Sequence, residues 1–309
     1  MLLLRRRPLG VPSIEPPRAE GRITLPRGGR LGYAEFGDPN GRLVLWFHGT
    51  PGGRRQVPPV ARREAEALGM RIVCVERPGV GGSTDHLYRA VGDWADDMAF
   101  VADDLGHERF AVVGLSGGGP YALACGARLG DRVTTVGVLG GVVPSVGDDA
   151  VATGIVDLAR KLNIVLRIGR VPFGVGLWST IRLITPLAHP GLLAFASVMP
   201  PGDQEVLHDP EIEAMFIDDL ELASRRQFRA GVNDGVLFGR PWGFELGEID
   251  VPVRWWHGNA DSIVSLGDAE DAVALIPDCE LHIRPGESHL GGFAAAHEVL
   301  QTLDALWPQ

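Results

Sequence analysis

The sequence of 309 residues predicts an α/β fold: a mostly parallel central sheet of about eight strands flanked by helices, with a helical segment inserted after the sixth strand. Two observations predict it. Short, continuous apolar runs alternate with amphipathic helical stretches, which is typical of a parallel sheet buried on both faces. The alternation then stops after residues 133–139 and resumes only at residue 251, and the interval consists of helical stretches broken by prolines.

The predicted strands begin with a hairpin. Residues 21–26 and 31–36 flank Arg27-Gly-Gly-Arg30, and the paired glycines indicate a tight connection between two antiparallel strands. The other strands are apolar runs lying between helical stretches, at residues 43–47, 71–75, 110–113, 133–139, 251–257 and 281–284. Within the inserted segment the clearest prediction is one helix that starts at Pro210, after an Asp209 cap, and continues to Ala230.

These elements divide the chain into three parts. Residues 1–20 contain four prolines and are expected to form a flexible N-terminal tail. The core domain is expected to consist of residues 21–144 and 236–309, and residues 145–235 to form a separate helical segment over it.

Composition restricts the function. The net charge is −10, with 29 basic and 39 acidic residues in scattered positions, which argues against a nucleic-acid partner. Three cysteines, Cys74, Cys125 and Cys279, have no metal-binding spacing and are expected to be reduced, which indicates a cytoplasmic protein. No apolar run approaches the length of a membrane span, and Met1–Pro8 lacks the order of a signal peptide.

The stretch with the most chemical content is Gly114-Leu-Ser-Gly-Gly118, which lies directly between a predicted strand and a predicted helix. A strand that turns at once into a helix forces its apex residue, Ser116, into a strained conformation. Gly114 and Gly118 allow the two arms to approach each other, and Ser116 then projects above the sheet beside the first free N–H groups of the helix. This arrangement is a nucleophile elbow; the alternative is a glycine-rich connection without chemistry.

Two further loops extend the pattern, His48-Gly-Thr-Pro-Gly52 and Glu76-Arg-Pro-Gly-Val-Gly-Gly-Ser83. Together with the elbow they resemble the signature loops of the α/β-hydrolase superfamily, and within it those of proline iminopeptidases. The resemblance implies the α/β-hydrolase fold with a helical cap. Two residues depart from the pattern: Gly117 stands where those peptidases typically place Trp, and Glu76 where the superfamily more often has Asp.

A catalytic triad follows in the order typical of that superfamily. Ser116 is the predicted nucleophile, Asp261 follows the strand at 251–257, and His289 follows the strand at 281–284. All three come just after strand carboxyl ends, where such sheets bind ligands. His289 would act as the base and Asp261 would hold its tautomer. Asp148 and Asp149 are the alternative acids, because some members of the superfamily carry the acid after the preceding strand.

The proposed chemistry also needs two donors for a developing oxyanion. The predicted donors are the backbone N–H groups of Thr50 and Gly117. His48, in the same loop as Gly49 and Thr50, could be mistaken for the base, and a structural role in bracing the loop is favoured. Neither a metal ion nor an organic cofactor is called for.

The inserted segment resembles the cap of capped α/β-hydrolases. Its large apolar residues could line an acyl pocket or simply form the core of a helical subdomain, among them Phe173, Leu177, Trp178, Leu183 and Phe195.

The favoured function is a serine hydrolase acting on a carboxylic ester or a similar small acyl substrate. One alternative is a proline-iminopeptidase-like aminopeptidase, whose cap would need acidic residues to bind a substrate amine; the candidates are Glu211, Glu213, Asp218, Asp219 and Glu221. Another is a ligand receptor that keeps the triad but turns over little. The sequence does not predict the oligomeric state.

Overall fold

The computed structural model describes residues 14–184, 197 and 199–308. Within them the sheet has eight strands in the order β1-β2-β4-β3-β5-β6-β7-β8. The β1–β2 and β2–β4 pairs are antiparallel, and the other five pairs are parallel. The strands are β1 Ala19–Thr24, β2 Arg30–Gly37, β3 Arg42–Phe47, β4 Met70–Val75, β5 Phe110–Leu115, β6 Val133–Leu139, β7 Val253–Gly258 and β8 Cys279–Arg284. The predicted fold class is confirmed.

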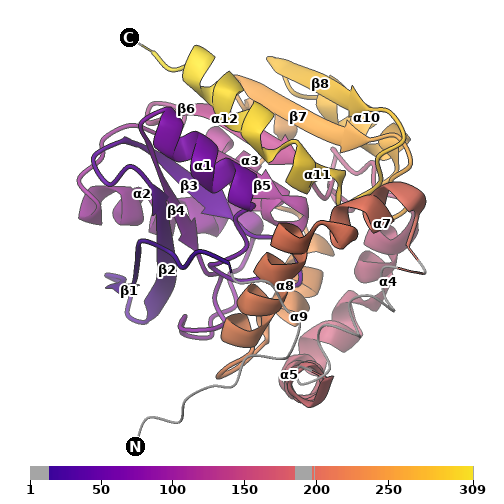
Figure 1. The fold of residues 1–309 in the computed structure, drawn as a ribbon. Coiled ribbons are helices and arrows are strands. Elements are labelled where there is room, and N and C mark those ends of the chain that lie inside the picture. The colour runs from indigo at the N-terminus through magenta and orange to yellow at the C-terminus, as the bar shows by residue number, and fades with distance from the viewer. Residues whose placement is uncertain (1–13, 185–196, 198, 309) are drawn as a thin grey trace, which may run out of the picture.

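Helices cover both faces of the sheet (Figure 1). One face packs against α1 and α12, and the other against α2, α3 and α10. Alternate residues of the central strands face opposite sides: Leu45 belongs to one apolar core and Trp46 to the other, and both are fully buried. The bounds are α1 Pro59–Ala67, α2 Trp94–Asp104, α3 Gly119–Arg128, α10 Leu266–Ala274, α11 Gly291–Ala294 and α12 Ala296–Ala305.

The segment after β6 is helical, as expected. Its described helices group beyond one end of the sheet in Figure 1, and they are α4 Gly154–Ile168, α5 Arg170–Ile184, α7 Pro201–His208, α8 Pro210–Ala223 and α9 Ala230–Phe238. Asp209 caps α8 by accepting hydrogen bonds from the N–H groups of Glu211 and Ile212. α9 runs across residue 235, the end expected for the segment.

The prediction of one helix from Pro210 to Ala230 is wrong. After Ala223 the chain pairs with the glycine-rich loop that follows β4 instead of continuing as a helix. The Ala223 carbonyl accepts from the Gly81 N–H at 2.8 Å, and the Arg229 N–H donates to the Gly79 carbonyl at 2.7 Å. Pairing with a neighbouring loop replaces the next helical turns, and propensity within the segment could not reveal this.

The N-terminal part only partly overlaps the predicted tail. Residues 1–13 lie outside the described residues, whereas Ala19 and Glu20 already belong to β1. Glu20 forms ion pairs with Arg54 and Arg55, at 2.8 and 2.7 Å.

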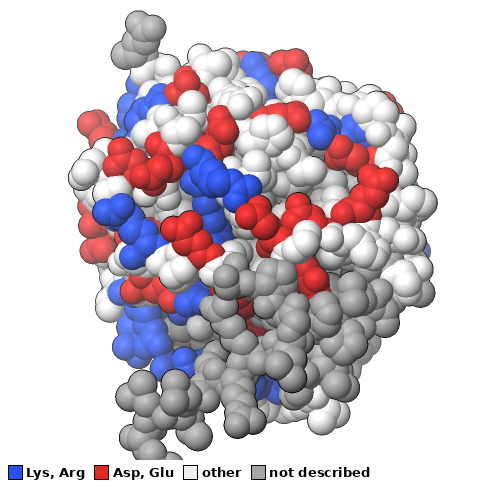
Figure 2. Space-filling model, in the orientation of Figure 1, with Lys and Arg blue, Asp and Glu red and all other residues white. Residues whose placement is uncertain are grey.

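On the face shown in Figure 2, acidic and basic side chains are interspersed. Among the described residues, no helix by itself has the length and apolar content to cross a membrane; Arg160–Ile168 and Arg170–Leu183, bent by 92°, meet those two criteria only as a pair.

Candidate active site

Ser116 lies at the sharp turn between β5 and α3. Its φ of 49° is positive, and it is the only residue other than glycine with a positive φ in the described part of the chain. A Cβ atom on Gly118 would lie 2.2 Å from the Phe47 carbonyl oxygen, and one on Gly114 would lie 2.5 Å from the Gly118 carbonyl oxygen. The two glycines therefore allow the close backbone approach that holds the strained serine.

The structure brings Ser116, His289 and Asp261 together in one hydrogen-bonded chain. Ser116 Oγ lies 2.7 Å from His289 Nε2, and His289 Nδ1 lies 2.8 Å from Asp261 Oδ2. Because an ionised carboxylate can only accept, Nδ1 carries the proton, which leaves Nε2 to accept from the serine hydroxyl. His289 and Asp261 are 7% and 8% exposed, so the hydrogen bond between them lies largely out of water.

Asp261 is held in place independently of His289. Its Oδ1 accepts from the N–H groups of Ile263 and Val264, at 2.8 and 3.0 Å. Burial disfavours the ionised form, but the hydrogen bond and charge of His289, with the Ile263 N–H, outweigh it and lower the pKa of Asp261 below its usual value. The sequence predicts His257 only as part of a strand, but its Nε2 lies 3.4 Å from Asp261 Oδ2.

Thr50 and Gly117 are neighbours in space. A Cβ atom on Gly117 would lie 3.5 Å from the Thr50 backbone nitrogen and only 2.3 Å from Thr50 Oγ1. Thr50 Oγ1 donates to Asp234 Oδ2 at 2.6 Å and lies 2.8 Å from the Arg77 guanidinium, which donates to it. A side chain at position 117 would push Thr50 away from both partners, which gives the departure from Trp at this position a steric reason.

His48 is fully buried within its loop. Its Nδ1 lies 2.8 Å from the Gly49 carbonyl oxygen, and its Nε2 lies 3.2 Å from the Arg77 backbone nitrogen. Burial and the Arg77 charge hold the pKa of His48 well below its usual value, so the ring is neutral, with Nδ1 donating and Nε2 accepting. Both nitrogens are engaged in the loops around the site, a geometry that fits bracing rather than base catalysis.

Residues 42–182 match the family model described as "alpha/beta hydrolase fold". Solved structures agree over nearly the whole chain. An α/β-hydrolase fold protein from Nakamurella multipartita is 24% identical, with 93% of this chain and 98% of that one covered and a TM-score of 0.66. The chain has the α/β-hydrolase fold.

Other similar proteins have names that report different activities. A thermophilic esterase from Thermogutta terrifontis is 19% identical, with 92% of this chain and 96% of that one covered and a TM-score of 0.61. A proline iminopeptidase from Xanthomonas citri is 31% identical over 114 residues. That match spans 36% of this chain and 36% of the relative, and this chain matches only about a third of the length of the first curated relatives. The resemblance to proline iminopeptidases is thus confirmed for part of the chain.

Asp148 and Asp149 lie elsewhere in this hydrolase fold. Asp149 Oδ2 accepts from the Leu246 N–H at 2.6 Å, and both aspartates line a cavity together with Trp242 and Phe244. It is Asp261 that lies within hydrogen-bonding distance of His289.

The apolar residues of the inserted segment have different surroundings. Phe173 and Leu183 are 46% and 79% exposed, and Phe195 lies outside the described residues. Trp178 packs in a small apolar cluster that the segment forms with Val80, and it donates its indole N–H to the Ser224 carbonyl at 2.8 Å. Leu177 lies closer to the site, since Leu177 and the Thr50 methyl group would both lie within 3.6 Å of a Cβ atom on Gly231.

Three of the acidic residues considered for amine binding have partners within the protein. Glu211 pairs with Arg63 at 2.9 Å, and Asp218 pairs with Arg55 at 2.9 Å. Asp219 accepts from backbone N–H groups of the loop that follows His48.

Proposed function

We propose that this chain is a serine hydrolase that cleaves a carboxylic ester or a related small acyl compound through an acyl-enzyme. One observation carries the proposal: Ser116, His289 and Asp261 form a continuous hydrogen-bonded chain that ends at a strained serine. A serine hydroxyl is a weak nucleophile by itself and needs such a base.

The reaction would proceed in two halves. His289 Nε2 takes the Ser116 proton as Oγ attacks the acyl carbon, and the N–H groups of Thr50 and Gly117 stabilise the oxyanion. His289 then gives the proton to the leaving alcohol, and a water molecule activated by His289 releases the acid from Ser116. Asp261 stabilises the imidazolium in both halves.

The first step of this proposal has a direct test. A fluorophosphonate probe should label Ser116, and S116A should lose both labelling and turnover of p-nitrophenyl acetate. Labelling elsewhere, or turnover by S116A at the parent rate, would remove the proposal.

The second candidate is a proline-iminopeptidase-like aminopeptidase, which the partial match to such enzymes favours. Against it stand Gly117, whose environment leaves no room for a side chain, and the engagement of Glu211, Asp218 and Asp219 with partners inside the protein. Parallel assays with prolyl-p-nitroanilide and p-nitrophenyl esters separate the two candidates. Faster amide turnover would reverse the ranking, and tight ligand binding without turnover would favour a receptor.

Two broader assignments accompany the proposal. We assign residues 21–144 and 236–309 to the catalytic core and 145–235 to a cap. The cytoplasm is the proposed compartment, supported by three cysteines that are all free. Fractionation of cells that produce the chain tests it, and recovery outside the cytoplasm would contradict it.

A further inference from the structure

Three helices of the inserted segment each carry one buried aspartate that reaches into the core domain. Asp203 on α7, Asp219 on α8 and Asp234 on α9 are each at most 2% exposed. An isolated carboxylate is costly to bury, so its hydrogen-bond partners must offset the loss of hydration. The partners of all three belong to loops and helices around the candidate active site.

Asp203 binds the residues on both sides of His289. Its Oδ2 accepts from the Ser288 hydroxyl at 2.8 Å, and its Oδ1 accepts from the Leu290 N–H at 2.7 Å. The preceding residue, Gly202, is in close contact with the same loop: a Cβ atom there would lie 2.6 Å from the Gly286 carbonyl oxygen. The start of α7 is thus fixed against the loop that carries His289.

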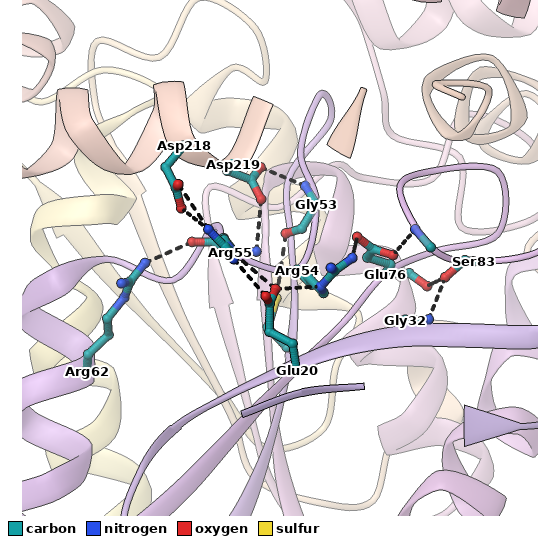
Figure 3. Close-up of polar contacts among 12 residues, drawn as sticks. Glu20, Gly32, Gly53, Arg54, Arg55, Arg62, Glu76, Ser83, Asp218 and Asp219 are labelled. Atoms are coloured by element: carbon teal, nitrogen blue, oxygen red, sulfur yellow. Dashed lines mark hydrogen bonds and ion pairs between the residues drawn. The ribbon is translucent and has the colours of Figure 1, made fainter. Parts of the chain in front are cut away.

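Asp219 binds the loop that follows the proposed oxyanion donor. It accepts from the Gly53 and Arg55 backbone N–H groups at 2.8 and 2.9 Å. Figure 3 shows Asp219 above this loop, while the Arg55 side chain turns away toward Asp218 and Glu20. Within the described residues Asp219 has no ion-pair partner, so these two N–H groups are its principal support.

Asp234 binds Thr50 itself. Besides the Thr50 hydroxyl at 2.6 Å, it accepts from the Tyr121 hydroxyl at 2.7 Å and from Arg77 at 2.9 Å. Arg77 in turn donates to the carbonyl groups of His48 and Gly49. The loop from His48 to Thr50 is therefore fixed to α9 through one buried ion pair.

We propose that Asp203, Asp219 and Asp234 are positioning residues, through which the inserted segment holds the loops that carry the base and the oxyanion donors. In this view the segment sets the rate of the chemical step as well as access to Ser116. Only the kinetic test of this inference depends on the proposed function. Misplacement of a catalytic group by about 1 Å can cost on the order of 100-fold in rate, so anchors of this kind matter.

Asp203 gives the sharpest test, because Asp203→Asn keeps the size of the side chain and removes one acceptor. The amide oxygen can still accept from the Leu290 N–H, but the NH₂ group then faces the Ser288 hydroxyl, which must turn from donor to acceptor, and the charge of the carboxylate is lost from both contacts. We expect kcat for p-nitrophenyl acetate to fall about 10- to 100-fold with KM within about threefold.

A matched control is available at the other junction of the segment. Asp268 on α10 is also buried and also accepts one backbone N–H and one hydroxyl, both from Thr153 at 2.9 Å. D268N changes the same kind of contact at a residue whose hydrogen bonds run to Thr153 and Ser265 and to none of Ser116, His289 and Asp261, and it should keep kcat within about threefold of the parent, even where its melting temperature falls. Both variants are compared at a temperature where circular dichroism shows them folded.

A second readout does not depend on turnover. The proton between His289 and Asp261 should give a strongly deshielded NMR resonance, which D261N identifies by its loss. In D203N this resonance should broaden or disappear, and in D268N it should persist. If D203N does not fold, S288A replaces it, because it removes only one of the two contacts of Asp203; we then expect a fall in kcat of about 3- to 10-fold.

The inference is overturned if D203N, or S288A in its place, matches D268N in kcat and keeps the resonance. A different result sinks the proposed function: a parent chain that hydrolyses no ester and is not labelled at Ser116. In that case the resonance alone still decides whether Asp203 positions His289.

Discussion

The central sheet and the inserted segment bury their residues in different ways. β5 and β6 are buried along their whole length by apolar packing on both faces. α4 and α5 instead leave large apolar side chains exposed, with Ile164 at 73% and Ile168 at 79%, whereas α7, α8 and α9 each bury an aspartate. Apolar area holds the sheet together and also packs Ile212 and Met215 of α8 into the core, whereas buried aspartates join the segment to the loops around the candidate site.

This difference has an energetic consequence. Apolar burial stabilises in proportion to area, so a core tolerates changes that preserve volume and pattern. A buried carboxylate depends on particular donors, and removing one partner leaves an uncompensated polar group at a cost of roughly 1–3 kcal/mol. Substitutions should therefore act gradually in the sheet and sharply at the anchors.

The largest expected effect concerns the core alone. S116A should lower kcat by roughly 10⁶-fold, as removal of the nucleophile does in known serine hydrolases, with stability changed by no more than about 0.5 kcal/mol. Stopped assays of p-nitrophenyl acetate hydrolysis and a thermal melt measure the two quantities. If S116A loses activity only because it unfolds, Ser116 contributes to stability, and the chemistry of the core cannot be separated from the anchoring of the segment.

Asp261→Asn should come next. It should lower kcat by about 10⁴-fold without unfolding the protein, because the amide no longer holds the Nδ1–H tautomer of His289. D148N and D149N are the controls, since Asp149 binds the Leu246 N–H instead. A larger loss of kcat in either control than in D261N would show that Asp261 is not the acid of the triad.

The sheet was predictable because its signal is local. Each strand is a short apolar run, and Gly114 and Gly118 mark the elbow whatever the rest of the chain does. The order Ser116, Asp261, His289 follows from strand order, so the sequence also predicts the three residues that the structure brings within hydrogen-bonding distance.

The anchors could not be predicted in the same way. Asp203 follows a Pro-Pro-Gly run that indicated only a break in the helices, and Asp219 and its neighbours on α8 could equally have formed a solvated face. Their partners lie far away in the sequence: Asp203 binds Leu290, and Asp234 binds Thr50. The early end of α8 has the same origin, because Ala223 binds Gly81 rather than its own next turn. Such contacts depend on docking between segments, for which periodicity gives no signal.

The buried carboxyl group of Asp219 should make the free energy of unfolding depend on pH. Burial raises its pKa from 3.8 to about 7, partly offset by the Arg55 and Gly53 N–H groups and reinforced by the charges of Glu76 and Asp218. Between about pH 4 and 7 the native state therefore binds more protons than the unfolded state. Stability attributable to Asp219 should fall as pH rises through this window, by at most about 1.4 kcal/mol per pH unit, and then level off.

The measurement is the free energy of unfolding in urea at several pH values from 5 to 8, for the parent and for D219N. The difference between the two curves isolates Asp219, since all other ionisable side chains are common to the two proteins. A difference that stays constant over this range would contradict the raised pKa.

The smallest expected effect concerns two exposed apolar residues of α5. Leu177 lies beside Gly231, whose other neighbour is the Thr50 methyl group, whereas Phe173 folds back toward Gly169 and away from these contacts. L177A should therefore change the ratio of kcat/KM for p-nitrophenyl octanoate to that for p-nitrophenyl acetate by about tenfold, which is about 1.4 kcal/mol and within the range of a methylene-sized contact. F173A should change it less than twofold. Leu177 and Phe173 are 37% and 46% exposed, so neither substitution should unfold the segment, and the ratio reports on the substrate path alone.

An equal change of the ratio in both variants would mean that the exposed apolar surface as a whole, and not Leu177 in particular, contacts the acyl chain. Loss of kcat on every ester in L177A, with the ratio unchanged, would mean that Leu177 supports the Thr50 loop as the buried aspartates do, and the division between anchors and apolar surface would then fail at this point.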